Sequence, residues 1–115
     1  MASRTEVERK LSGLIARLDA SQEGARSLAG TLPEPRTLAV HLSDLGDTYW
    51  AVLEGGRLGA LTRGEPDRGD ITIRAPSDVL VDLIDGNGSL FAAYLAGRIR
   101  IEASVSDLLR LRRLL

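Results

Sequence analysis

The residue types that carry most enzyme chemistry are scarce in this chain. It contains one histidine, His41, and no cysteine. Without cysteine the chain forms neither a disulfide nor a thiolate nucleophile, and a lone histidine lacks the second imidazole or thiolate that would complete a metal site. His41 stands between aliphatic neighbours in an alternating segment, which favours a structural histidine over a base or a metal ligand. We therefore expect no catalytic residue, no metal and no cofactor.

Three carboxylates, Asp78, Asp82 and Asp85, follow one another at spacings of four and three residues. On a helix this spacing places them on one side, opposite a stripe of aliphatic residues. We interpret the pattern as a solvated helix face rather than as a calcium site or an acid-base pair. The glycine-containing segments match neither the phosphate loop nor the dinucleotide fingerprint and are explained by turns. The sequence therefore predicts a protein that is not an enzyme.

The length and composition indicate one globular domain spanning residues 1–115. The chain is 43% hydrophobic and 27% charged, and the charges are well mixed with apolar residues. This mixture is unlike that of disordered chains, and the length suits one hydrophobic core better than two. We find no internal repeat and no linker in the sequence.

The balance of charge gives no overall attraction to nucleic acid or to an anionic membrane. Fifteen basic and sixteen acidic residues leave a formal net charge of −1. The N-terminal sequence lacks the apolar core of a signal peptide, and no later segment approaches the roughly 20 apolar residues of a membrane span. We expect a soluble, cytoplasmic protein that binds no nucleic acid and does not insert stably into a membrane.

Hydrophobic periodicity divides the chain into helices and strands. The expected elements are an amphipathic helix at 6–19, a shorter helix at 21–30, a three-stranded antiparallel meander between 36 and 62, a strand at 70–74, helices at 77–85 and 89–96, a strand at 98–102 and an apolar helix at 105–115. Capping patterns support three of the helices: Thr5 with Glu8, Ser77 as an N-cap, and Ser104 with Asp107.

The C-terminal half carries a run of features in a recognisable order. The features are DITI at 70–73 followed by SDVL at 77–80, Gly86, AAYLAGRIRI at 92–101 and DLLRLRRLL at 107–115. In this order they resemble the sterol-carrier-protein-2-like (SCP-2 sterol-binding) domain. The resemblance implies an α+β fold with a five-stranded, mainly antiparallel sheet, helices packed on one face, and an apolar tunnel between the layers that takes lipids.

The apolar faces of the C-terminal helices supply the candidate tunnel residues. They are Leu80, Leu83, Ile84, Phe91, Tyr94, Leu95, Leu108 and Leu111, with Trp50 from the sheet as a candidate at the ligand mouth. For each residue taken alone, core packing is the competing interpretation, because apolar helical stripes normally exist to be buried. The expected ligand is an apolar small molecule or lipid such as a fatty acid, an acyl-CoA or a sterol-like lipid, and the expected role is non-catalytic binding or carriage.

A second hypothesis is a protein-interaction or accessory domain whose tunnel has collapsed. It is motivated by the short chain and by Ala96, which stands where the family often has a polar amide. Under this hypothesis the C-terminal Leu/Arg helix pairs with a partner or with a second copy, so a homodimer is one expected form.

Overall fold

The structure is a computed structural model that describes residues 2–20 and 35–112. Its elements are α1 (Arg4–Ala20), β1 (Arg36–Leu42), β2 (Asp47–Glu54), β3 (Arg57–Leu58), β4 (Thr62–Arg63), β5 (Ile71–Ala75), α3 (Ser77–Ile84), α4 (Leu90–Leu95), β6 (Arg100–Ala103) and α5 (Val105–Arg112). The helix predicted at 21–30 lies outside the described residues, as does the end of the helix predicted at 105–115. The other predicted elements are present with shifted ends.

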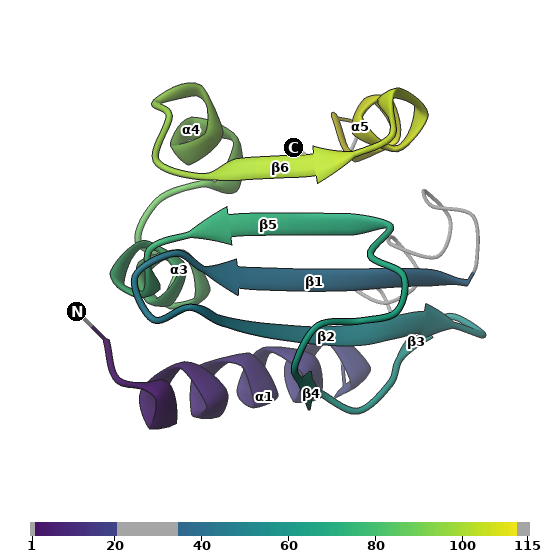
Figure 1. Ribbon diagram of the computed structural model, residues 1–115, viewed down its shortest axis with the longest axis horizontal. Helices are drawn as coiled ribbons and strands as arrows, with labels where there is room; N and C mark the ends of the chain where they lie inside the picture. Colours follow the sequence, from purple (N-terminus) through teal and green to yellow (C-terminus); the bar gives the residue numbers. More distant parts are fainter. Residues whose placement is uncertain (1, 21–34, 113–115) are drawn as a thin grey trace.

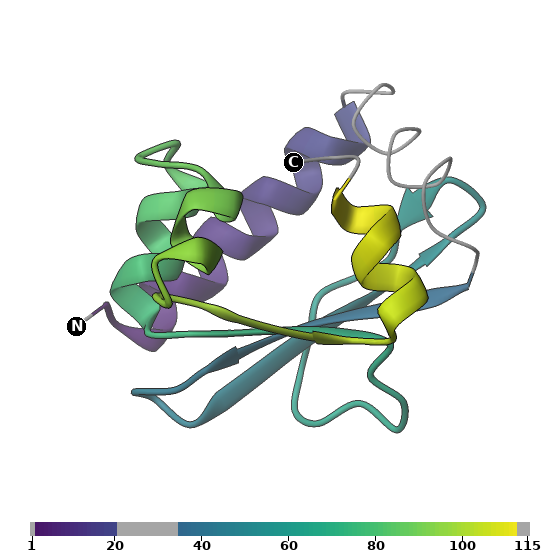
Figure 2. The same ribbon diagram turned by 90° about the horizontal axis from the view of Figure 1, so that it is seen from above.

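The strands form one sheet, and the described helices cover a single face of it (Figures 1 and 2). The strand order is β3-β2-β1-β5-β6, and β4 also pairs with β2. The pairing of β1 with β5 is parallel and the other pairings are antiparallel. These observations confirm the predicted α+β fold and the mainly antiparallel sheet.

The third strand of the predicted meander is split in two. Leu58 of β3 pairs with Leu53, and Thr62 of β4 pairs with Trp50. Residues 59–61 therefore lie opposite only two residues of β2, so this edge has one more residue than its partner strand. One extra residue on one strand of a pair defines a β-bulge. The extra residue ends the pairing of β3 and lets β4 resume it farther along the same edge.

The segment between β4 and β5 crosses the sheet on the face opposite the helices (Figure 2). His41 takes part in its attachment. Thr48 donates its hydroxyl proton to Glu65 at 2.8 Å. His41 Nδ1 lies 2.8 Å from the same hydroxyl oxygen, so the imidazole must be the donor in that contact. The histidine is part of a hydrogen-bonded connection between strands and crossover, as the structural interpretation predicted.

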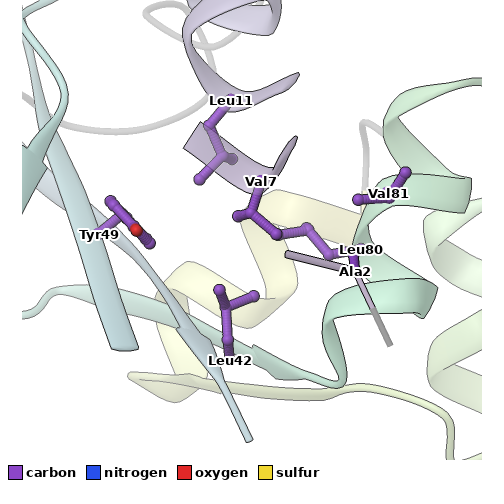
Figure 3. Packing of buried hydrophobic residues seen from close by; sticks show 7 residues of the cluster. All are labelled: Ala2, Val7, Leu11, Leu42, Tyr49, Leu80 and Val81. Carbon is purple, nitrogen blue, oxygen red and sulfur yellow. The ribbon is translucent and has the colours of Figure 1, made fainter. Parts of the chain in front are cut away.

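The largest buried cluster lies where α1 crosses the ends of β1 and β2 beside α3 (Figure 3). Its members are Ala2, Val7, Leu11, Leu42, Tyr49, Leu80 and Val81. Val7 and Leu11 are one helical turn apart on α1, so a single face of the helix supplies both side chains. This packing fixes α1 over the sheet.

The N-terminus of α3 departs from the predicted cap. Pro76 is the N-cap residue and Ser77 is the first helical residue, so the prediction of Ser77 as N-cap was wrong. Proline has no side chain that can accept a hydrogen bond, and Asp44 from the β1–β2 turn takes over this role. Its Oδ1 accepts the Ser77 backbone N–H at 2.8 Å, and its Oδ2 accepts the Ser77 hydroxyl at 2.5 Å. A cap supplied by a residue 33 positions away in the sequence cannot be identified from the local sequence of the helix.

The start of α1 also differs from the predicted Thr5–Glu8 capping box. Ser3 supplies the cap, because its hydroxyl oxygen accepts the Glu6 backbone N–H at 3.1 Å. Glu8 instead accepts a hydrogen bond from Tyr49. At α5 the predicted cap is present, since the Ser104 hydroxyl oxygen accepts the Asp107 backbone N–H at 3.1 Å.

Candidate functional site

An apolar cavity of about 270 Å³ lies between the helix-covered face of the sheet and helices α1, α4 and α5. The helices contribute Leu11, Leu14 and Ile15 from α1, Leu90 from α4 and Leu111 from α5. No charged residue is among the lining residues of the described chain. The cavity therefore offers room and dispersion contacts to a hydrocarbon but no ion pair.

The floor of the cavity follows from strand alternation and register. Leu38 pairs with Ala51 on one side and with Ile71 on the other, and Ile73 pairs with Ile101. Cross-strand partners share a face of the sheet, so these side chains form one apolar surface beneath the helices. Ala51 is small, while Tyr49 and Leu53 on the same strand face are large. The missing side-chain volume at Ala51 contributes to the space.

Tyr49 lines the cavity, but its hydroxyl group is already engaged. The hydroxyl donates to the Glu8 carboxylate at 2.8 Å. Burial, and then this hydrogen bond, raise the pKa of Tyr49 to about 12. The phenol therefore stays neutral at physiological pH and presents its ring to the cavity.

Two of the nine predicted tunnel residues border this cavity. Leu111 of α5 lines it from the helix layer. Trp50 also borders it, but strand alternation directs the Trp50 side chain to the face opposite Tyr49 and Ala51. Trp50 thus meets the cavity with its backbone, while its ring lies on the crossover side of the sheet.

The other predicted tunnel residues do not line the cavity. Leu80 is buried in the cluster with Val7, and Ile84 packs against that cluster. Leu83 packs against a separate buried cluster, and Leu108 is half-buried outside the lining. Leu80, Leu83 and Ile84 therefore belong to the core, which is the competing interpretation of an apolar helical stripe.

The face that helix α4 turns inward differs in part from the predicted one. Leu90 and Ala93, three residues apart, face the interior. Phe91, Tyr94 and Leu95 lie on the neighbouring face and are exposed. The predicted apolar stripe of this helix was Leu90, Phe91, Tyr94 and Leu95. Leu90 does face inward, but the small Ala93 approaches the sheet in place of the other three.

The lining residues that sequence reasoning missed come chiefly from α1 and the strands. The strand residues could have been recognised from the sequence, because Leu38 and Val40, like Ile71 and Ile73, are two residues apart and so lie on one face of the sheet. What the alternation could not give is which part of that face the helices leave uncovered. No group of three potential metal-ligating side chains occurs among residues 2–20 and 35–112.

Comparison with known proteins identifies the family. The model of the SCP-2 sterol transfer family matches residues 11–115, which is most of the chain. The chain belongs to the SCP-2 sterol transfer family. Membership supports lipid binding or transfer in general as its role. No curated protein matches this sequence significantly.

Solved structures share the fold at low sequence identity. The sterol carrier protein domain 2 of Helicoverpa armigera is 20% identical, with 95% of this chain and 84% of that chain covered and a TM-score of 0.64. The apo form of sterol carrier protein 2 from Yarrowia lipolytica is 15% identical, with 90% and 88% covered and a TM-score of 0.61. At such identities the likeness concerns the fold.

The same fold occurs inside a much larger enzyme. A stereoselective inverting sec-alkylsulfatase from Pseudomonas sp. is 19% identical over 73% of this chain, with a TM-score of 0.57. The alignment covers only 13% of that enzyme.

Within the described residues, no helix is both long and apolar enough to span a membrane.

Proposed function

We propose that this chain binds or carries an apolar ligand, such as a fatty acid, an acyl-CoA or a sterol-like lipid, without catalysing a reaction on it. The observation that carries the proposal is the cavity of about 270 Å³ between sheet and helices, lined by apolar and aromatic residues. Membership of a sterol transfer family supports the same role.

The energetics are consistent with useful affinity from apolar contacts alone. Each buried methylene contributes roughly 0.8 kcal/mol, so about twelve would contribute on the order of 10 kcal/mol before the cost of association. That cost is about 4 to 15 kcal/mol, and a preformed cavity keeps it low. Since none of the described residues that line the cavity is charged, we expect the hydrocarbon part of the ligand inside and any polar head at the opening.

A fluorescent fatty acid tests the proposal directly. We expect it to bind saturably, with a dissociation constant on the order of micromolar, and to be displaced by unlabelled fatty acid. Ala51→Phe should weaken binding about tenfold or more, because its ring excludes the volume of at least two methylenes of ligand. Fluorescence titration against protein concentration measures the dissociation constants of the wild type and of Ala51→Phe.

Ala16→Phe is the matched control. Ala16 is exposed on α1 and is not among the lining residues, so the same substitution there should leave affinity unchanged. Equal affinities for the wild type and Ala51→Phe, with Ala51→Phe folded by circular dichroism, would place the ligand elsewhere. Absence of saturable binding by the wild type at tens of micromolar would refute the proposed function.

Self-association or partner binding through α5 is a second candidate function. Val105 and Leu109 are 74% and 58% exposed and lie one turn apart on this helix. If the pair forms an interface, sedimentation velocity should detect a dimer that Leu109→Gln abolishes. A wild type that stays monomeric at high concentration would argue against self-association.

A further inference from the structure

A second pocket, of about 480 Å³, lies at the edge of the sheet where β5 ends and β6 begins. Unlike the apolar cavity, it is rich in positive charge, because Arg74, Arg98 and Arg100 all line it. Tyr94, from the end of α4, lines it as well. The pocket therefore joins a basic group to the exposed face of a helix.

Two of the three arginines, Arg98 and Arg100, have no ion-pair partner among residues 2–20 and 35–112. Arg74 and Arg100 are direct partners in the antiparallel pairing of β5 with β6. Like charges directly opposite each other on a sheet are destabilising. Arg74 has an ion pair with Glu102, whereas Arg98 and Arg100 form none within the described part of the chain. An anion bound at this point would remove the repulsion.

The helix beside these arginines presents an apolar stripe to solvent. Phe91, Tyr94 and Leu95 are 43%, 43% and 68% exposed. Their spacing of three and four residues places them on one face of α4. An apolar stripe of this kind is normally buried, and when exposed it marks an interaction surface. Tyr94 belongs both to the stripe and to the basic pocket.

From this juxtaposition we infer that the α4–β6 surface, formed by Phe91, Tyr94, Leu95, Arg74, Arg98 and Arg100, docks on an anionic lipid bilayer. Arginine binds phosphate groups through its planar set of donors, and aromatic and leucine side chains enter the interfacial region of a bilayer. The formal net charge of the chain is −1, so the attraction is local to this surface.

The position of the surface suits this partner. Helix α4 and the start of β6 lie together at one corner of the molecule, away from α1 (Figure 1). Leu90 on the inward side of α4 lines the apolar cavity. Docking through the outward side would therefore place the cavity beside the bilayer. Docking at this surface does not require that the cavity takes a lipid.

Sedimentation with vesicles tests the docking surface. At low salt we expect the full chain to bind phosphatidylcholine vesicles that contain phosphatidylglycerol, and to bind pure phosphatidylcholine vesicles much more weakly. A basic residue near an anionic surface changes partitioning about fivefold, so Arg98→Gln with Arg100→Gln should reduce binding roughly 25-fold. Leu95→Gln should also reduce binding, and salt should weaken binding of the wild type.

Arg9→Gln with Arg57→Gln is the matched control. Both arginines are exposed and without an ion pair in the described residues, and Arg57 lies at the opposite edge of the sheet. This variant removes the same charge and should still bind. If both double variants lost vesicle binding equally, net charge would explain the effect and the assignment of the surface would be overturned. Unchanged vesicle binding by Arg98→Gln with Arg100→Gln would overturn it as well.

Two further outcomes would also overturn the docking inference. One is saturable binding of inorganic phosphate at these arginines without any vesicle binding. The other is a dimer that the same substitutions abolish, which would make a second copy of the chain the occupant. Fatty-acid binding in solution should be unchanged in Arg98→Gln with Arg100→Gln, because neither residue lines the apolar cavity. Docking and ligand binding can therefore fail separately.

Discussion

Ser77→Ala is expected to lower the free energy of unfolding by about 3 kcal/mol, since it removes a buried hydroxyl that joins three segments. Ser77 is 0% exposed. Its hydroxyl donates to Asp44, and its oxygen accepts the backbone N–H of Ala2 at 3.1 Å. Alanine leaves the buried Ala2 N–H without this partner and frees the N-terminal segment from α3. Urea denaturation of both proteins measures the difference.

Acid dependence gives this prediction a second readout. The Ser77 hydroxyl, which donates to Asp44, is the main cause that holds the pKa of Asp44 below its ordinary value of 3.8. A carboxyl group with a lowered pKa stabilises the folded state above its unfolded pKa and loses this contribution as the pH falls. The stability gap between wild type and Ser77→Ala should therefore be widest near neutral pH and narrow below about pH 4.

Ser12→Ala is the control for the loss of a serine hydroxyl, because Ser12 is exposed within α1. It should change stability by less than about 0.5 kcal/mol. If Ser77→Ala were equally mild, the hydrogen bonds to Asp44 and Ala2 would not hold the N-terminal segment in place.

The strands and helices of this fold could be predicted because their signals are local. Alternation marked the residues of β1, β2 and β5, and helical spacing marked α1. The cap of α3 could not be predicted in this way. Asp44 follows β1 and Ser77 follows β5, and the parallel pairing of these strands brings the two residues together, so the hydrogen bond depends on the tertiary structure.

The candidate site was less accessible to sequence reasoning than the fold. A tunnel was expected from the family resemblance, and Phe91, Tyr94 and Leu95 were assigned to it because they lie on an apolar stripe of their helix. In the structure that helix approaches the sheet through Leu90 and Ala93. Apolar spacing alone does not decide which helical face turns inward, since a small residue allows closer packing. Much of the lining comes from strands, where alternation identifies the face but not its uncovered part.

We expect the loss of unfolding free energy at alkaline pH to depend on Tyr49. Its folded pKa of about 12 exceeds the ordinary 10.0, so the neutral phenol is favoured by folding. This contribution to stability is therefore complete below pH 10 and is lost as the pH rises toward 12. A difference of about two pKa units corresponds to at most roughly 3 kcal/mol of unfolding free energy. Urea denaturation at successive alkaline pH values measures the loss.

Tyr49→Phe separates this titration from other alkaline effects. At neutral pH it should cost only about 1 kcal/mol, because the ring still fills its place and the Glu8 carboxylate, 42% exposed, can be hydrated instead. Between pH 10 and 12 the variant should lose less stability than the wild type and overtake it if the full shift applies. Tyr94→Phe, at the exposed tyrosine, should keep the wild-type profile. Parallel alkaline profiles for wild type and Tyr49→Phe would mean that burial of this phenol does not govern the titration.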